Sequence, residues 1–428
     1  SIFSQTLEAI KNLDYPGEKL EIVVVDDSTQ GDLVRETKIL CENLQIRYMH
    51  RDNRKGFKAG AINSVLEEVK GEFLLILDAD QIPFPHIVKD LIPYFIDTRV
   101  AFVQAKLSFR NMDCVTRSCA GLIHSEFYEV IEKAKDTTGL VTFAGTTGMF
   151  RKTALLEVGG FGEETLVEDF DTSVKLFAKG YRSRLANTYG SIGLTPWHFS
   201  SHVVQLWRWA QGTTSVLRKR ASLILRSELS FFQKFDLLLT ASVTPASVSI
   251  LLLATMVSFM VLLDIPIIRM GNSVPLYLMM PTFLMLSHFI SAIYAQRWGN
   301  QEGVPKHTLW EVIPFSIFTL MILPFLASAV VSGLMGKKNI FQRTEKALPG
   351  NEDVQKVVGP VTSQKVLRNS FLAFLLGLFL IVSGILAYVQ NNLLFGFLIS
   401  VGICCILPIP LLINDFRIHG KKKIAKAT

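Results

Sequence analysis

The sequence lacks the glycine-rich loops with which many proteins hold the phosphates of a nucleotide. It contains neither a P-loop nor a dinucleotide-binding glycine pattern, and the run "GGFG" at 159–162 has the spacing of neither. It also lacks any repeat of aromatic and basic residues and any other nucleic-acid-binding motif. A phosphate-handling site in this chain would therefore depend on a metal ion, and nucleic acid is not an expected partner.

Cysteine is scarce as well. The 428 residues include five cysteines, and none has the spacing of metal ligands. We interpret all of them as reduced packing residues, consistent with a cytosolic domain. They are Cys41, Cys114, Cys119, Cys404 and Cys405.

Charge is missing from long stretches of the second half of the chain. Four uncharged runs follow residue 226, at 237–263, 271–296, 312–336 and 370–414. About 20 apolar residues are enough to cross a hydrocarbon core, so each run is long enough to span a membrane. The last run is interrupted by "QNN" (390–392), which predicts two helices joined by a hairpin. We therefore expect a soluble domain at 1–225 and a membrane domain at 226–428.

The net charge of +7 is concentrated beside these runs. Basic residues favour the cytoplasmic ends of membrane helices, so we expect an integral plasma-membrane protein with a cytoplasmic soluble domain. The basic clusters are at 218–220, 337–338 and 421–423.

The run at 312–336 differs from the others. If it spanned the membrane, the basic stretch 336–346 would lie outside the cell, against the positive-inside tendency. It also contains Pro314 and Pro324. We predict an interfacial or re-entrant helix at about 310–336 and about four transmembrane helices elsewhere. The alternative is that all five helices span.

The first half of the chain alternates between strand-like and helix-like segments. This alternation predicts an α/β, Rossmann-like domain, in which ligands bind at the carboxyl ends of the strands. Two of the strand-like segments end in acids, the first with Asp26-Asp27 and the second with "DAD". We expect strands at 18–29, 46–50, 71–83 and 100–105 and a helix at 58–69.

The "DAD" motif places Asp78 and Asp80 on the same side of an extended chain. Carboxylate oxygens are suited to Mg²⁺ or Mn²⁺, which bridge phosphates. Alone, this motif is weak evidence for a metal site, because it is more often part of a solvated turn. We expect these acids and those of "VEDFD" (167–171) to share one sheet edge with Asp26-Asp27, where a cation and a nucleotide diphosphate would offset their mutual repulsion. A carboxylate beside such a site can act as a general base.

Together with Gln205-x-x-Arg208-Trp209, these motifs resemble the processive family-2 glycosyltransferases in order and rough spacing. That family includes cellulose synthase, glucomannan synthase-like enzymes, hyaluronan synthase and chitin synthase. The segment "FAGTTGMFR" (143–151) looks like the family's acceptor-site loop. The resemblance covers roughly residues 1–220 and, by layout, the membrane half. It implies a GT-A-type fold.

The resemblance also implies residue roles. Asp169 would be the general base that deprotonates the acceptor hydroxyl. Asp80, with Asp78, would hold Mg²⁺ or Mn²⁺. The nucleotide sugar would contact Asp26, Asp27, Lys58, Asp78, Gln205, Arg208 and Thr344. The acceptor would contact Phe143, Gly145, Thr146, Glu168 and Trp209.

The two tryptophans that follow Gln205, Trp207 and Trp209, are expected to have different roles. On a helix, Gln205, Arg208 and Trp209 share one face, and the Trp209 ring can stack on a sugar. Trp207 points elsewhere, and we predict that it anchors the chain at the membrane interface.

A second match lies in "FQRTEKA" (341–347), which resembles the gating loop F-x-V-T-x-K-G of cellulose synthase. Phe341, Thr344 and Lys346 are present, while Arg343 and Ala347 depart from the pattern. We expect a gating-like loop at 337–365; a basic juxtamembrane loop is the alternative. The family's first strand and its P-x-Y-N-E-like segment are not found, so we expect an amino-terminally truncated chain.

The leading hypothesis is an inverting transferase that adds hexosyl units from UDP-glucose, or from another UDP- or GDP-hexose, to a growing β-linked polysaccharide and translocates it across the membrane. Accessory subunits are further expected partners. One alternative is non-processive transfer to a membrane lipid. Another is a transporter with a regulatory soluble domain, which the near absence of ionisable residues in the apolar runs disfavours.

Overall fold

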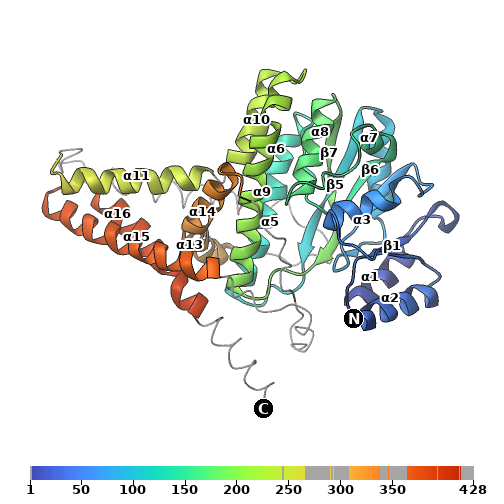
Figure 1. Cartoon of the computed structure of the whole chain (residues 1–428), viewed down its shortest axis with the longest axis horizontal. Helices are drawn as coiled ribbons and strands as arrows, with labels where there is room; N and C mark the ends of the chain where they lie inside the picture. Colours follow the sequence, from blue (N-terminus) through green and yellow to red (C-terminus); the bar gives the residue numbers. More distant parts are fainter. Residues whose placement is uncertain are drawn as a thin grey trace, which may run out of the picture.

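The computed structural model describes residues 2–242, 245–265, 308–337, 364–392 and 394–413, together with residues 290, 293, 346 and 415. The chain begins with helix α1 (Ile2–Lys11), followed by a short helical turn, η1 (Gly17–Lys19). Figure 1 shows the α/β part on one side and the apolar helices α11, α15 and α16 extending from it.

The first acid-bearing strand belongs to a small parallel pair. Strand β1 (Val23–Asp26) pairs with β2 (Arg47–His50), and helix α2 (Gly31–Asn43) makes the crossover that a parallel pair requires. The strands end with Asp26 opposite His50. The predicted strands at 18–29 and 46–50 are thus present.

The second acid-bearing strand belongs to a separate, mixed sheet. Its strand order is β3-β6-β5-β7-β4. Only β5 and β7 are parallel; the other neighbours are antiparallel. The expectation that all acid-bearing strands share one sheet edge is therefore wrong, because hydrophobic patterning does not specify strand partners. The five strands are β3 (Phe73–Ile76), β4 (Ile82–Pro83), β5 (Val100–Phe109), β6 (Gly148–Arg151) and β7 (Arg182–Gly193).

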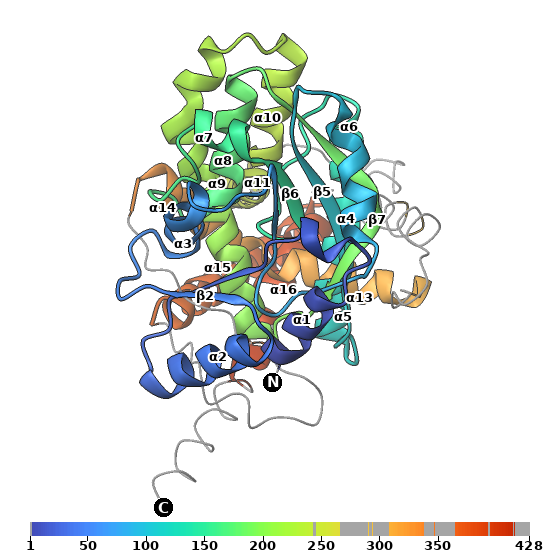
Figure 2. The ribbon, with the colours of Figure 1, turned by 90° about the vertical axis from the view of Figure 1, so that its right-hand side faces the viewer.

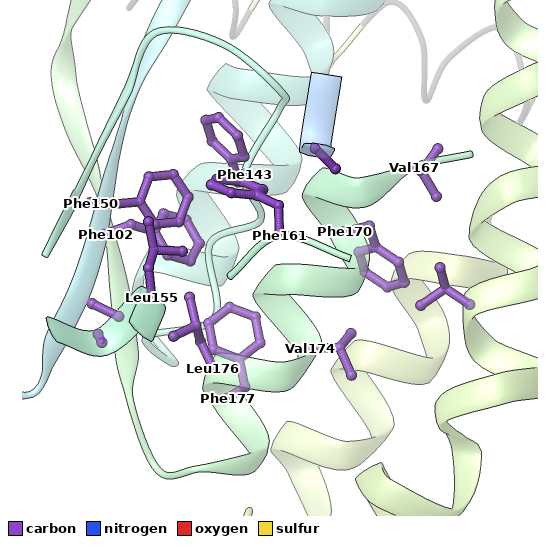
Figure 3. Packing of buried hydrophobic residues seen from close by; sticks show 14 of the residues in the cluster. Phe102, Phe143, Phe150, Leu155, Phe161, Val167, Phe170, Val174, Leu176 and Phe177 are labelled. Atoms are coloured by element: carbon purple, nitrogen blue, oxygen red, sulfur yellow. The ribbon is translucent and has the colours of Figure 1, made fainter. Parts of the chain in front are cut away.

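The central strand β5 is buried along its whole length, as expected of a strand covered on both faces. A cluster of phenylalanines packs against it, with the Phe102 and Phe150 rings stacked 4.9 Å apart (Figure 3). Each such buried side chain stabilises the fold by about 1.5–3 kcal/mol. The packing helices include α3 (Phe57–Leu66), α7 (Lys152–Glu157) and α8 (Glu168–Ala178).

A second layer of helices covers the other side of β5. Helix α5 (Val115–Glu126) continues through a π-helical turn, η3 (Phe127–Glu132), into α6 (Lys133–Asp136). Within this layer Glu129 accepts a hydrogen bond from the Lys106 ammonium at 2.7 Å, and both side chains are buried. Figure 2 shows this layer beside the sheet, with α4 (Ile87–Leu91) nearby; α4 leads into a short turn, η2 (Ile92–Ile96).

Helix α9 (Phe199–Arg226) joins the α/β domain to the apolar helices. It packs closely on α14 (Leu323–Leu334). The two helices are so close that a Cβ atom at Gly333 of α14 would lie only 2.7 Å from the backbone oxygen of Gln211 on α9. Helix α9 ends close to the predicted domain boundary at residue 225. The following helices are α10 (Phe231–Ser242), α11 (Pro245–Leu262), α13 (Val312–Met321), α14 (Leu323–Leu334), α15 (Gln364–Val389) and α16 (Phe395–Ile406).

Within the described residues, two helices are long and apolar enough to span a membrane, Arg368–Val389 and Phe395–Ile413. They correspond to the hairpin predicted from the final run. The helices α13 and α14 form a pair bent by 43°, as in a broken span or a re-entrant loop. The predicted run at 271–296 lies almost wholly outside the described residues, and the proposed membrane topology stays a prediction.

Candidate active site

A pocket of about 1630 Å³ opens where the ends of β1 and β3 approach helix α9. Although the two strands belong to different sheets, both acid motifs line this pocket. Of the predicted site residues, those that line it are Asp26, Asp27, Lys58, Asp78, Asp80, Gly145, Thr146, Glu168, Asp169, Gln205, Arg208 and Trp209.

The two "DAD" carboxylates each contact an ammonium group. Lys58, near the start of α3, donates a hydrogen bond to Asp78 Oδ1. Lys346 donates to Asp80 Oδ2 at 2.6 Å, although it is 266 residues away in sequence. Burial is the largest single influence on the pKa of Asp78 and would raise it, but the charge and hydrogen bond of Lys58, together with the charges of Lys346 and Arg208, lower this pKa overall. These contacts identify the motif as a cation-attracting part of the pocket.

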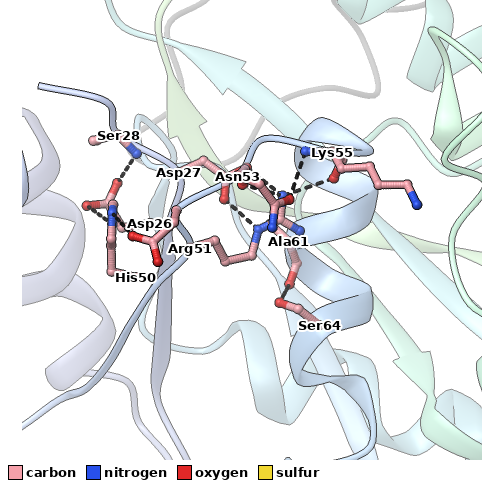
Figure 4. Close-up of polar contacts among 10 residues, drawn as sticks. Asp26, Asp27, Ser28, His50, Arg51, Asn53, Lys55, Ala61 and Ser64 are labelled. Carbon is pink, nitrogen blue, oxygen red and sulfur yellow. Dashed lines mark hydrogen bonds and ion pairs between the residues drawn. The ribbon is translucent and has the colours of Figure 1, made fainter.

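The carboxylates at the end of β1 are held by their own surroundings (Figure 4). Asp26 accepts hydrogen bonds from the Ser28 backbone N–H at 2.8 Å and from the Tyr48 hydroxyl at 2.9 Å. Asp27 accepts two from the Arg51 guanidinium, at 2.8 and 3.1 Å. Asp27 therefore faces the pocket as half of a bidentate ion pair, while Asp26 shapes the turn.

Asp169 lies in the first turn of α8, close to the acceptor-loop segment. A Cβ atom at Gly145 would lie 3.1 Å from Asp169 Oδ2, and Gly145 has a φ of 87°, so glycine suits this position on both counts. Burial, followed by the negative charge of Glu168, raises the pKa of Asp169 to about 7. A carboxyl group with that pKa can accept a proton near neutral pH.

Helix α9 supplies a cation and an amide. Arg208 is close enough to Glu168, Asp169 and Asp78 for their charges to raise its pKa, although burial outweighs them and lowers it. The side-chain oxygen of Gln205 is buried without a hydrogen-bond partner in the described part of the chain. A buried polar atom of this kind is satisfied when a polar ligand binds.

Trp209 faces the pocket beside residues that the sequence did not single out. The His124 ring meets the Trp209 ring edge-on, with centroids 5.6 Å apart, and packs on Phe109 at 4.6 Å. Trp207 does not line the pocket and packs against the apolar cluster between α9 and α13, which Trp209 also contacts. His124 and Phe109 had no recognisable motif, since only the fold brings α5 and β5 next to α9.

Of the other predicted residues, Phe143 does not line the pocket, and neither does Asp171, an acid of "VEDFD" to which no role was assigned. The Phe143 side chain is 3% exposed and belongs to the phenylalanine core. Asp171, near Asp169 in sequence, is fully buried and bonds twice to Arg220 on α9, at 2.7 and 3.0 Å. Thr344 lies outside the described residues.

The pattern of the family "Glycosyl transferase family group 2" matches residues 73–413, which is most of the chain. The chain belongs to this family. The prediction of a family-2 glycosyltransferase related to cellulose and glucomannan synthases is thereby confirmed. The matched span of this chain includes both α/β elements and the apolar helices.

Two curated relatives illustrate the similarity. The cellulose synthase catalytic subunit [UDP-forming] of Xanthomonas axonopodis pv. citri is 32% identical over 224 residues, which cover 51% of this chain and 30% of that protein. Glucomannan 4-beta-mannosyltransferase 9 of Arabidopsis thaliana is 26% identical over 386 residues, covering 86% of this chain and 69% of that protein. The chain spans about a third of the bacterial subunit and about two thirds of the plant enzyme.

A solved structure supports the fold. The mannosyltransferase PcManGT from Pyrobaculum calidifontis, in complex with GDP-Man and Mn²⁺, superposes with a TM-score of 0.51 at 20% identity, covering 79% of this chain and 84% of that one. This level of similarity supports the predicted GT-A-type α/β fold.

Asp78 and Asp80 are the carboxylates of the pocket that could hold a divalent cation. The described residues contain no group of three or more His, Cys, Asp and Glu side chains arranged to hold a metal. Asp78 and Asp80 offer hard carboxylate oxygens on the pocket surface, and both already contact cationic groups. They fit one side of a Mg²⁺ or Mn²⁺ site whose remaining ligands would be phosphate oxygens and water.

Proposed function

We propose that this protein is a metal-dependent, inverting hexosyltransferase that transfers sugar from a UDP- or GDP-hexose to a growing β-linked glycan at a membrane. The observation that carries the proposal is the meeting of acid motifs from two sheets with Lys58, Arg208 and Trp209 around one pocket. The relatives named cellulose synthase and glucomannan mannosyltransferase support this class of product. Among these donors, UDP-glucose is the one that we propose.

The charge of each side chain in the pocket indicates which part of the donor it would bind. Lys58 and Arg208 would bind the donor diphosphate, whose charge their side chains complement. Asp78 and Asp80 would hold a divalent cation, which offsets the negative charge of the departing diphosphate. Asp27, already ordered by Arg51, would face the nucleoside.

Asp169 would act on the acceptor. Its carboxylate takes the proton from the acceptor hydroxyl as that oxygen bonds to the anomeric carbon of the donor. The bond from the anomeric carbon to the diphosphate breaks in the same displacement, and both bonding electrons leave with the diphosphate. Attack opposite to the leaving group inverts the anomeric configuration.

The acceptor end of the pocket would be formed by Trp209 and Gln205. The aromatic face of Trp209 can stack on the apolar face of a sugar ring, and the buried oxygen of Gln205 can accept a hydrogen bond from a hydroxyl. Helix α9 then continues towards the apolar helices. We infer that these helices anchor the protein in the membrane with the pocket facing the cytoplasm, and that they provide the route for the glycan.

A panel of labelled nucleotide sugars tests the proposal. Membranes containing the protein would be incubated with UDP-glucose, GDP-mannose and UDP-N-acetylglucosamine in the presence of Mg²⁺ or Mn²⁺. Label in a polymer that β-glucanase or β-mannanase degrades is the expected result. Label that appears only in an organic-solvent extract would instead identify a lipid acceptor, and no incorporation from any donor would overturn the proposal.

A further inference from the structure

The segment 142–147 runs along the pocket between η3 and β6, and buried side chains from several other elements hold it. Glu132 accepts hydrogen bonds from the backbone N–H and the hydroxyl of Thr142. Ser173 on α8 accepts one from the Phe143 N–H at 3.0 Å. These contacts fix only the first part of the segment.

Gln104, on the central strand β5, holds the middle of the segment from both sides. Its Oε1 accepts a hydrogen bond from the Ala144 N–H at 2.9 Å, and its Nε2 donates to the Thr146 oxygen at 3.0 Å. Nε2 also donates to the oxygen of Ala105 at 2.7 Å, which ties the amide to its own strand. The side chain is completely buried, so water cannot replace these bonds.

The end of the segment is held in an unfavourable conformation. Thr147 has a φ of 57°, in the left-handed region that β-branched residues rarely adopt. Its hydroxyl shares a 2.7 Å hydrogen bond with Ser191, and its N–H donates to the Ile76 oxygen at 2.7 Å. Such a conformation persists only where the surroundings enforce it.

The restrained segment contacts three groups of the pocket. The Gly145 oxygen accepts a hydrogen bond from the Lys58 ammonium. The Thr146 hydroxyl accepts one from the Asp78 N–H at 2.9 Å. The close approach of Gly145 to Asp169 completes the set. The position of this segment therefore sets how the diphosphate-facing groups lie relative to the base.

We propose that Gln104 is a positioning residue for sugar transfer, which acts by holding the segment 142–147 in register with Lys58, Asp78 and Asp169. The inference rests on the proposed function, since it assigns Gln104 to the same reaction. Gln104 itself is not among the residues that line the pocket.

Two substitutions test whether the hydrogen bonds of the Gln104 amide, and not merely its volume, are needed. Gln104→Met keeps the volume but removes all four hydrogen bonds of the amide, the fourth being from Nε2 to the Thr147 oxygen at 3.4 Å. Gln104→Glu keeps an acceptor for Ala144, and in its protonated form it also offers an O–H to Thr146. Ser183→Ala is the matched control, because Ser183 is also fully buried on the same sheet and its hydroxyl donates to the Val141 and Gly139 oxygens, outside the segment.

The assay compares kcat and the KM for the nucleotide sugar across pH, with melting temperature as a fold check. We expect Gln104→Met to lower kcat/KM by about 10- to 100-fold, because small misplacements of reacting groups have effects of that size. Gln104→Glu should recover activity relative to Gln104→Met as the pH falls and the buried carboxyl gains its proton. Ser183→Ala should lose stability while its kcat and KM stay near those of the wild type.

Hydrogen–deuterium exchange gives a readout that needs no activity. Amides of residues 144–147 should exchange faster in Gln104→Met than in the wild type or Ser183→Ala. A folded Gln104→Met protein with unchanged exchange, or with kcat and KM within about twofold of the wild type, overturns the inference. A wild-type protein that transfers no sugar would instead refute the proposed function, and the exchange result would still decide whether Gln104 holds the segment 142–147.

Discussion

The Asp169→Asn substitution should abolish transfer and stabilise the protein at the same time. Asp169 has a pKa of about 7, raised from 3.8 by burial and by the charge of Glu168. Its ionised form is thus disfavoured in the folded protein relative to the unfolded chain. The neutral amide would remove this unfavourable charge together with the base.

The size of the effect follows from the pKa. A rise from 3.8 to about 7 corresponds to at most about 4 kcal/mol at 1.4 kcal/mol per pH unit. Because Asp169 lines an open pocket, where solvent screens its charge, we expect a measured gain of about 1–3 kcal/mol at pH 8. The folded state binds the extra proton between about pH 4 and 7, so the wild type loses stability as the pH rises through that window. The advantage of the variant should therefore shrink towards pH 4.

Asp171→Asn provides a matched comparison on the same helix. Asp171 is also buried, but it bonds twice to the Arg220 guanidinium. Loss of those charge-assisted bonds should destabilise the protein by about 2 kcal/mol. The melting temperatures of both variants would be measured in detergent from pH 5 to 8. Relative to the wild type, we expect Asp169→Asn to raise the melting temperature and Asp171→Asn to lower it. If Asp169→Asn lowers the melting temperature at pH 8, or leaves transfer intact, the assignment of a buried base is wrong.

Wild-type transfer should rise about tenfold per pH unit below pH 7 and level off above it, as Asp169 loses its proton, and a flat initial-rate profile from pH 5.5 to 8 would contradict this. Lys58→Met should raise the donor KM by about tenfold or more in initial-rate assays, since a charged hydrogen bond is lost, while exposed Lys55→Met should not; equal effects would remove Lys58 from the diphosphate site. Trp209→Leu should reduce polymer formation by about tenfold and Trp207→Leu far less, and the reverse order would argue against stacking at Trp209. A single cysteine at residue 343 should resist membrane-impermeant reagents added from outside, and external labelling would overturn the predicted topology.

Local patterns identified most of the elements that carry the site. The short strand that ends in Asp26, the strand that ends two residues before Asp78, and the helix bearing Gln205 form where hydrophobic patterning and helix spacing predict them. Each is a local property of at most about 12 residues, so no distant contact was needed to infer it.

Two other features depended on long-range packing. Sequence patterning did not indicate that β1 and β3 occupy separate sheets, because strand partners are chosen by tertiary contacts. Nor did it reveal Gln104, whose hydrogen-bond partners in the segment lie about 40 residues away and whose role exists only in the folded protein. Phe143 shows the opposite error, since a motif position that suggested an acceptor contact instead supplies a core side chain.

The anomeric configuration of the newly formed linkage tests the central claim most directly. The product from an α-linked nucleotide sugar would be released as oligosaccharides and examined by proton NMR. A single displacement with Asp169 as base predicts a β-linkage, and the signal should be absent with Asp169→Asn. An α-linked product, or a β-linked product formed equally well by the variant, would contradict the account.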